Sequence, residues 1–502
     1  MPLDQSIVFD GGWRLLEGQR PFRDFTTPAG LVPMALQAVL FKALGVTWFV
    51  YCLHAALFNG LFCVLAFRVL LRLDAGIPAS ASYAILSGVV FYPPFGVPYA
   101  EQHAFFFSLA AVAALVEAAT APPGRHRTLA LAALPWLLAL AWFSKQVPST
   151  LVLPLVGLLP LLLDRRDRLP ALRTLLWSAA AMALLLAAAL LTTDATRLVE
   201  ALFTRPGLEG RGRMLALLDP AAFVGQGGEL LRALRFWSLG PTLVGALAFL
   251  FWPPRKAAAF RRPPFWFRPL LALYLLAICA LFVMVTGNQG ENGIPFAFLA
   301  VGLVHAELRL FGLGSRERRV ALALAGMLVV SSAWDALSFN RRVNETRMVH
   351  ELDGVARAEP REEAVLPPAL GFLEWKLHPF YRFTPGNLAE TVSFLRHEKG
   401  AIYVFGDLTI LYALTGRPST GDSLWLHPGL TMPEPGRPGF EAWEARLVRE
   451  LERRGVRFFV RESRQTYNGL RLSHLPRLAA LIERRRQRRL SFGPIDVIEL
   501  GP

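Results

Sequence analysis

Residues 47–72, TWFVYCLHAALFNGLFCVLAFRVLLR, decide the fold class of this chain. Only Arg68 and Arg72, near the end of the segment, carry a charge at neutral pH. About 20 apolar residues in a helix, rising about 1.5 Å each, cross the ~30 Å hydrocarbon core of a bilayer. The segment is therefore predicted to be a membrane-spanning helix.

Further apolar segments of similar length follow, and together they predict about ten spans. The predicted spans are 47–72, 78–97, 101–120, 128–145, 147–164, 171–193, 234–253, 269–287, 294–312 and 318–338. The chain has 502 residues, of which 54% are hydrophobic and 18% charged, so it is too apolar for an ordinary soluble protein and too charged to be embedded throughout. We therefore predict an α-helical polytopic membrane domain over residues 47–338, with water-exposed parts before and after it.

Most loop arginines fall on one side of the membrane if successive spans alternate in direction. They are Arg68, Arg72, Arg125, Arg127, Arg165, Arg166, Arg168, Arg173, Arg255, Arg261, Arg262, Arg268, Arg309, Arg316, Arg318 and Arg319. The positive-inside rule assigns that side to the cytoplasm. This distribution accounts for much of the net charge of +15, so no nucleic-acid partner is predicted.

An even number of spans places residues 1–46 and everything after residue 339 outside the cytoplasm. The arginine-rich, signal-free chain looks bacterial, so the predicted location is the cytoplasmic (inner) membrane. Because no signal-like segment precedes Asp4, we expect the natural product to begin upstream, with one more span before Pro2.

The C-terminal part, residues 339–502, differs in character. Short apolar strands at 401–405 and 456–460 alternate with helical stretches at 408–415 and 438–454, which predicts a small α/β domain. We expect its arginine cluster, residues 484–489, to be a solvated helix face or a contact to anionic lipid head groups.

The N-terminal segment carries carboxylates beside the membrane. Residues 6–17 have helical character, and Gly18 is suited to end that helix in the left-handed conformation. Asp4 then stands at one end of the helix and Asp24 beyond the other; Asp4 fits a helix cap and a functional carboxylate about equally well. Residues 30–45 are apolar but too short to span, which predicts an interfacial or re-entrant helix.

A family resemblance gives this segment a functional interpretation. Asp4-Gln5, then Gly18-Gln19-Arg20-Pro21-Phe22-Arg23-Asp24-Phe25, then Pro28 and Gly30 before an apolar helix, resembles the first external loop of GT-C superfamily glycosyltransferases. The closest likeness is to the protein O-mannosyltransferase-like bacterial branch, which includes lipid A aminoarabinose transferase and lipopolysaccharide core sugar transferases. The resemblance implies transfer of a hexose or pentose from a polyprenyl-phosphate carrier to a lipid, glycan or protein acceptor at the outer face.

The resemblance also implies site residues. The acidic residue that opens the loop, Asp4, becomes the predicted general base, with Asp24 in support, and Glu101 resembles a second acidic position of the superfamily. Glu101 is equally well explained as a favourable charge at a helix N-terminus. Whether these carboxylates share a divalent cation or work without a metal or other cofactor is left open by the sequence.

Cations at the predicted outer side are candidates for binding the donor phosphate. Lys145 closes an apolar span there, and its alternative role is snorkelling to the lipid head groups. Arg211 and Arg213 lie in a glycine-rich stretch that we expect to be a flexible loop, either phosphate-binding or simply solvated. His54 and His103 lie in apolar surroundings, which favours buried, hydrogen-bonded histidines over metal ligands.

Two other function classes compete with the transferase. A transporter or flippase for lipid-linked glycans would favour charged or broken helices at the bilayer midplane, whereas the acidic residues here gather near the outer surface. A non-catalytic membrane scaffold would leave Asp4 and Lys145 replaceable.

Overall fold

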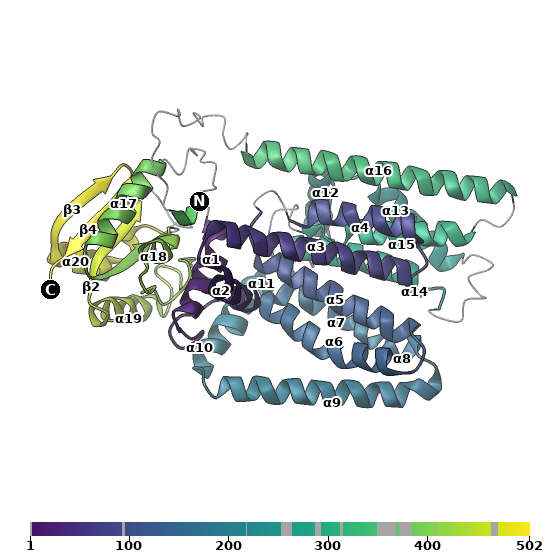
Figure 1. Ribbon diagram of the computed structural model, residues 1–502, viewed down its shortest axis with the longest axis horizontal. Coiled ribbons are helices and arrows are strands. Elements are labelled where there is room, and N and C mark those ends of the chain that lie inside the picture. The colour runs from purple at the N-terminus through teal and green to yellow at the C-terminus, as the bar shows by residue number, and fades with distance from the viewer. Residues whose placement is uncertain are drawn as a thin grey trace.

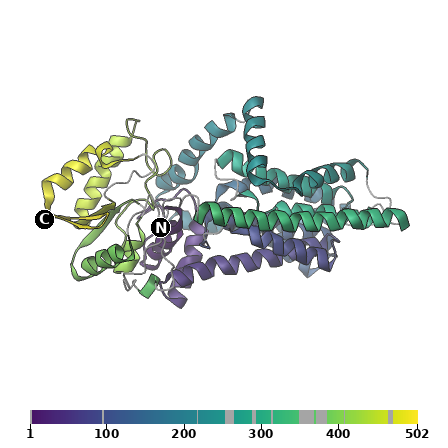
Figure 2. The ribbon, with the colours of Figure 1, turned by 90° about the horizontal axis from the view of Figure 1, so that it is seen from above.

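The structure is a computed structural model that describes residues 3–92, 96–216, 218–252, 264–286, 293–311, 315–348, 368–370, 384–406, 408–462 and 470–502. It consists of an elongated helical bundle with a small mixed α/β domain at one end (Figure 1). The N-terminal helix lies at that same end, and helix α16 runs along the bundle (Figures 1 and 2).

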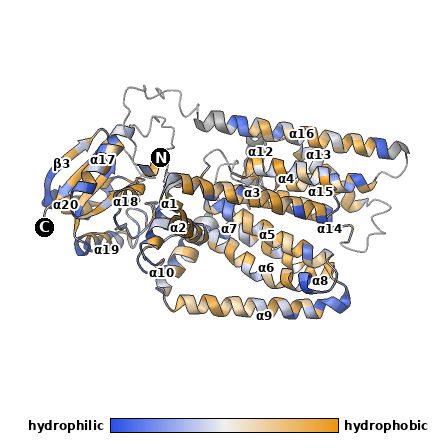
Figure 3. Cartoon of the chain, in the orientation of Figure 1, coloured by the Kyte–Doolittle hydropathy of each residue, from blue (hydrophilic) through white to orange (hydrophobic). Residues whose placement is uncertain are grey.

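Six helices of the described residues are long and apolar enough to cross a bilayer. They are α3 (Trp48–Arg72), α5 (Ala100–Thr120), α6 (Arg125–Ser144), α9 (Arg165–Leu190), α14 (Phe267–Thr286) and α16 (Ser315–Met348). Apolar residues cover the bundle helices, as Figure 3 shows, and large side chains such as Trp177 and Leu184 of α9 point outward, 77% and 73% exposed. Such a surface suits lipid rather than water, and the chain is a multi-pass membrane protein.

Four of the ten expected spans form shorter helices. They are α4 (Ile77–Phe91), α7 (Gln146–Gly157) with α8 (Leu159–Leu162), α13 (Leu239–Phe251) and α15 (Ala297–Phe311). Prolines explain these bounds, because proline lacks the N–H of a continuing helix and restricts the residue before it. Pro93 follows the end of α4, Pro253 follows α13, and Pro295 precedes α15.

Ion pairs join the predicted cytoplasmic loops to one another. Arg72 pairs with Glu117 at 2.8 Å, and Arg127 pairs with Asp167 at 2.6 Å. The fully buried Arg268 at the start of α14 contacts Glu307 of α15 at 2.5 Å and Asp74 at 3.2 Å. These arginines therefore share one end of the bundle, as the loop pattern predicted.

The C-terminal domain contains a four-stranded mixed sheet in the order β1-β2-β4-β3. Its elements are α17 (Pro385–His397), β1 (Ala401–Phe405), α18 (Ile410–Thr415), α19 (Phe440–Arg453), β2 (Val456–Glu462), α20 (Pro476–Arg485), β3 (Arg486–Phe492) and β4 (Ile495–Leu500), with short 3₁₀ turns at Pro368–Leu370 and Leu472–His474. The strands β1 and β2 are parallel, and the other pairs are antiparallel. The two strands and two helices expected from the sequence are confirmed.

The expected helix face for the arginine cluster is wrong for most of its members. Arg486, Arg488 and Arg489 lie in the edge strand β3 rather than in a helix. Arg488 pairs with Glu499 at 2.6 Å and Arg489 with Asp496 at 2.7 Å, both on the neighbouring strand β4. Cross-strand ion pairs of this kind, which a helical reading of the sequence cannot reveal, stabilise the hairpin.

The N-terminal segment forms two helices, α1 (Leu3–Leu16) and α2 (Leu31–Leu44). As expected, Gly18 follows α1 with a φ of 80°, and residues 30–45 contain a single helix too short to span. Phe9 of α1 is fully buried, with its ring centroid 4.8 Å from that of Phe41 in α2 and 5.3 Å from that of Tyr51 in α3. Aromatic packing thus holds α1 against the bundle.

The segment after α9 is helical. It contains α10 (Ala195–Val199), the π-helical turn η1 (Glu200–Thr204), α11 (Arg205–Ala216) and α12 (Pro220–Leu234). The expectation of a flexible glycine-rich loop around Arg211 is therefore wrong. Each glycine costs a helix about 1 kcal/mol relative to alanine, and α11 is contacted at both ends: Arg205 donates to Glu200 at 2.6 Å, and Arg213 donates to the carbonyl oxygen of Thr286.

Candidate functional site

Two of the predicted site residues meet at the end of the bundle that adjoins α1. Lys145, between α6 and α7, donates a hydrogen bond to Glu101 in the first turn of α5. Their side chains are 21% and 14% exposed, and the Lys145 ammonium also lies 5.7 Å from the ring centroid of Phe282. A cation and a carboxylate from separate helices thus form a half-buried pair.

The loop between α1 and α2, residues 17–30, reaches this pair. The backbone N–H of Gly30 donates to the carbonyl oxygen of Ser144 at 2.8 Å, directly before Lys145. Gln146, directly after it, donates to the carbonyl oxygens of Pro28 at 2.8 Å and Leu202 at 3.2 Å. The end of the α1–α2 loop, the α6–α7 junction and η1 therefore meet around Lys145.

Asp24 stabilises a tight turn in the α1–α2 loop. Its carboxylate accepts a hydrogen bond from the backbone N–H of Arg20 at 2.7 Å. Phe22, at the centre of the turn, has a φ of 61° and is buried with Ala201 and Leu202 of η1. Asp24 is partly exposed and lies within electrostatic range of Arg453 in the C-terminal domain.

The other predicted site residues occupy different positions. Asp4 belongs to the first turn of α1, but its side chain lies outside the described part of the structure. Arg211 is exposed on α11, while Arg213 is half-buried against the last turn of α14. Thr286, which accepts from Arg213, is one turn away from Phe282, which packs near Lys145. Arg213 and Lys145 therefore lie near the same end of α14.

A buried chain of hydrogen bonds runs through α2, α3 and α5 beside Glu101. It joins Gln37 to His54 Nδ1 at 2.9 Å, His54 Nε2 to His103 Nε2 at 2.9 Å, and His103 Nδ1 to the carbonyl oxygen of Tyr99 at 2.7 Å. Because a carbonyl only accepts, His103 Nδ1 donates; in a neutral ring its Nε2 then accepts from His54. The Gln37 atom beside His54 Nδ1 is the side-chain oxygen Oε1, which can only accept. A neutral His54 that donates through Nε2 needs a donor at Nδ1, so the Gln37 amide must be turned to bring its nitrogen, which has no partner among the described residues, to that position. The prediction of buried, hydrogen-bonded histidines is confirmed.

A polar contact that the sequence prediction missed attaches α1 to the C-terminal domain. Arg14 donates to Asp10 at 2.9 Å and to the carbonyl oxygens of Gly421 and Ser423 at 2.7 and 3.4 Å. Ser419 donates to the other oxygen of Asp10 at 2.7 Å. The available signal was an Asp and an Arg four residues apart, set among apolar residues in the second half of α1.

The neighbouring loop of the C-terminal domain also pairs with the α1–α2 loop. The backbone N–H and the hydroxyl of Thr26 donate to the carbonyl oxygen of Asp422 at 2.8 and 3.2 Å. Burial raises the pKa of the Asp422 carboxyl, and the positive charges of Arg446 and Arg197 act in the opposite direction. The junction between the two loops thus places the Asp422 carboxyl within electrostatic range of several arginines.

No group of three or more His, Cys, Asp or Glu side chains within the described ranges is arranged to hold a metal ion. The described residues place carboxylates and cations where α1, the α6–α7 junction and the C-terminal domain approach one another. No protein-family model matches the chain, and no curated protein is significantly similar to it.

Proposed function

We propose that this protein is a glycosyltransferase that moves a sugar from a polyprenyl-phosphate donor to an acceptor at the outer face of a bacterial cytoplasmic membrane. The observation that carries the proposal is the Lys145–Glu101 pair beside the α1–α2 loop. It supports a site at which a lipid-borne phosphate can meet an ammonium group, next to the loop whose sequence resembles that of the GT-C transferases.

In the proposed reaction, an acceptor hydroxyl attacks the anomeric carbon of the donor sugar. The bond from that carbon to the phosphate oxygen breaks, and the lipid phosphate leaves with the bonding electrons. Asp4 takes the proton of the attacking hydroxyl, a role worth roughly 10²–10⁴ in rate. The Lys145 ammonium stabilises the charge that develops on the phosphate.

Glu101 has a positioning role in this scheme. Its carboxylate holds the Lys145 ammonium at the N-terminal end of α5 and compensates its charge before the donor binds. Asp24 holds the shape of that loop through the N–H of Arg20. Asp4 thus transfers the proton, and Lys145 contacts the donor phosphate. Arg211 and Arg213 of α11 are further candidate cations for that phosphate.

The test of the reaction is a comparison of membranes that contain wild-type protein, Asp4→Asn or Lys145→Ala, each supplied with a polyprenyl-phosphate sugar. The donor and product are first identified by comparing the glycolipids of a deletion strain with those of its parent. We expect Asp4→Asn to lower turnover by about 10²–10⁴. Unaltered turnover in correctly inserted protein would exclude Asp4 as the base.

Lys145→Ala should weaken donor binding while the protein remains inserted, and Lys42→Ala, which changes an exposed lysine on α2, is the matched control. An unchanged apparent donor affinity would assign Lys145 to head-group contact alone. A flippase would move the donor across the bilayer without forming a glycosylated product, so the appearance of product distinguishes the two functions.

A further inference from the structure

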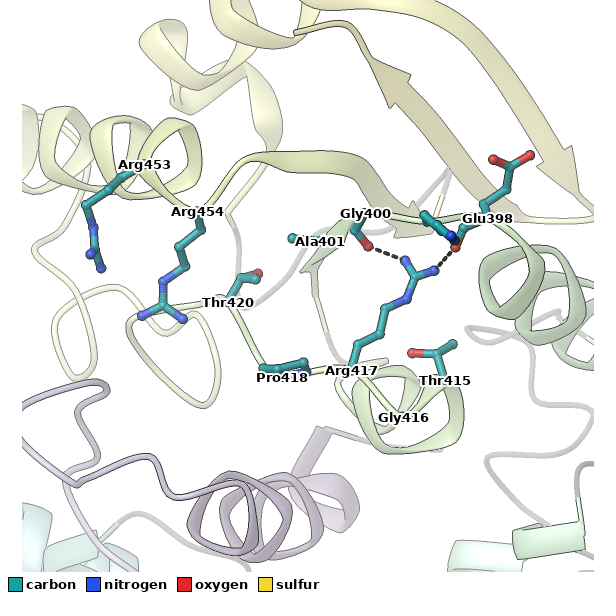
Figure 4. Close-up of a pocket in the computed structure, with 11 residues that line it drawn as sticks. Glu398, Gly400, Ala401, Thr415, Gly416, Arg417, Pro418, Thr420, Arg453 and Arg454 are labelled. Atoms are coloured by element: carbon teal, nitrogen blue, oxygen red, sulfur yellow. Dashed lines mark hydrogen bonds between the residues drawn. The ribbon is translucent and has the colours of Figure 1, made fainter.

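The C-terminal domain contains a cavity of about 730 Å³ on the side where α1 docks. Three parts of the domain line it: the turn before β1, the loop after α18, and the end of α19 (Figure 4). Small-molecule sites in proteins are typically cavities of about 300–1,000 Å³. The cavity is therefore large enough for a ligand well beyond a single inorganic ion.

Its lining is strongly basic. Four cationic side chains line the cavity, Lys399, Arg417, Arg453 and Arg454, against one carboxylate, Glu398. That carboxylate pairs with Arg457 and Arg488 of the sheet at 3.3 and 3.4 Å, and Figure 4 shows it pointing away from Arg417. Glu450, just outside the lining, pairs with Arg453 and Arg454 at 2.7 and 2.5 Å, whereas the side-chain hydrogen bonds of Arg417 go to backbone carbonyl oxygens. The four cations therefore keep a net positive charge over the two carboxylates, Glu398 and Glu450.

The two central arginines are held in fixed positions. Arg417 donates to the carbonyl oxygens of Gly400 at 2.6 Å, Leu395 and Glu398 (Figure 4). Arg454 donates to Glu450 at 2.5 Å and to the carbonyl oxygen of Ser419 at 3.0 Å. Preorganised guanidinium groups bind oxyanions with less loss of conformational entropy than free ones.

The positive charge around Arg417 is only partly compensated. Burial lowers the pKa of its guanidinium, the neighbouring Arg457 lowers it further, and the Glu398 carboxylate acts in the opposite direction. An anion that enters the cavity would relieve this repulsion. Lys399 at the rim is exposed and offers three N–H donors to such an anion.

The remaining lining has the mixed character that sugar rings require. Ala401 and Pro418 give apolar walls for C–H groups, while Thr415 and Thr420 contribute hydroxyls that already donate to backbone carbonyls and keep acceptor capacity. We infer that this cavity, whose lining carries four cationic side chains, binds a saccharide with a phosphate or carboxylate group.

The position of the cavity connects such a ligand to the α1–α2 loop. Trp13 donates to the carbonyl oxygen of Arg417 at 3.0 Å, and Gln19 donates to that of Ser419 at 2.8 Å. The loop of residues 417–420 therefore forms one wall of the cavity and also accepts hydrogen bonds from α1 and from the residues that follow it. Binding at this site does not depend on the proposed transferase activity, since it needs neither Asp4 nor a donor lipid.

The test is a calorimetric titration of the full-length protein in detergent with glucose 6-phosphate, glucuronate, glucose and inorganic phosphate. The two anionic sugars should bind more tightly than glucose and than phosphate alone. Equal affinity for glucose and glucose 6-phosphate would overturn the role of the anion. Equal affinity for phosphate and glucose 6-phosphate would show that the sugar ring does not contribute to binding and would overturn the inference of a saccharide ligand.

Variants locate the site. Arg454→Gln should lower the affinity for glucose 6-phosphate about tenfold, the loss expected for one charge-assisted hydrogen bond. Lys399→Gln should lower the affinity for glucose 6-phosphate by a smaller factor. Because Lys399 is exposed, misfolding would not explain that loss. The matched control is Arg449→Gln, an exposed arginine of α19 outside the cavity lining. Unchanged affinity in the Lys399→Gln, Arg454→Gln double variant would refute the inference.

Discussion

Arg14 and Asp10 form an ion pair 2.9 Å long whose side chains are 1% and 0% exposed, at the contact between α1 and the C-terminal domain. Each partner also forms hydrogen bonds with the C-terminal domain: Arg14 donates to the carbonyl oxygens of Gly421 and Ser423, and Asp10 accepts from the Ser419 hydroxyl. The pair thus joins segments about 400 positions apart in the chain. Because its groups are satisfied from both sides, it specifies how the domain sits against α1.

Asp10→Asn should loosen this contact. The substitution leaves the Arg14 charge buried without its counter-ion, and breaking a buried pair in this way costs about 3–5 kcal/mol. We expect faster amide hydrogen exchange in residues 417–423 and a lower melting temperature. Glu434→Gln, which removes an exposed ion pair with Arg437, is the control and should cost about 0–1 kcal/mol. If the Asp10→Asn variant kept the wild-type exchange rates in residues 417–423, the ion pair would not be what holds the domain against α1.

Glu307→Gln should destabilise the opposite end of the bundle. Arg268 and Glu307 are buried together at 2.5 Å, and each has one further polar atom without a partner in the described structure. Loss of the carboxylate leaves Arg268 with only the partly exposed Asp74, at 3.2 Å, as its counter-ion, so it should cost at most about 3–5 kcal/mol in thermal unfolding. Arg268→Met with Glu307→Leu should recover most of that loss. If the double variant were as unstable as the single one, the charge would not be the cause.

The two buried histidines should behave as one unit. His54→Leu leaves His103 Nε2 without its partner, which should cost about 1–3 kcal/mol in a detergent unfolding experiment. The double variant with His103→Leu should cost less than the sum of the single variants, because residues in one hydrogen-bond network are not additive. Exposed His126→Leu is the control, with an effect within about 0.5 kcal/mol. Strict additivity would contradict the coupling.

Glu450 should give the C-terminal domain a defined response to acid. Hydrogen bonding to Arg453, and then to Arg454, lowers the pKa of its carboxyl from 4.5 to about 2. A carboxyl with a depressed pKa in the folded state stabilises above its unfolded pKa, and this contribution is lost as the pH falls from about 4.5 toward 2. Because Arg453 is 72% exposed, we expect about 1 kcal/mol at most.

The measurement for Glu450 is the difference in melting temperature between wild-type protein and Glu450→Gln as a function of pH. This difference in melting temperature should be constant near neutral pH and should shrink as the pH falls from about 4.5 toward 2. Glu483→Gln, which removes an exposed carboxylate paired with Arg486 at 3.1 Å, should show no comparable change. A difference that persists at the acidic end would mean that the Glu450 effect is not electrostatic.

The sequence predicted the membrane helices and the two central strands because both leave a local signature. The long apolar run of α3 and the short apolar strand β1 are visible in the residues themselves. Local patterns failed where distant contacts decide the structure. The arginines of β3 resemble a helix face until Glu499 and Asp496 on β4 pair with them, and α11 resembles a loop until its ends contact Glu200 and Thr286.

For the site, the family resemblance nominated Glu101 and the predicted topology nominated Lys145, and only the packing of α5 against the α6–α7 junction joined them. Asp10 and Arg14 were not nominated, since an Asp and an Arg one turn apart are ordinary on a helix. The sequence by itself determined that the chain crosses a membrane several times and ends in an α/β domain, because hydrophobicity and its period are local properties. Which charges face one another was decided by tertiary structure, because ion pairs and cavities form between segments that are not adjacent in the chain.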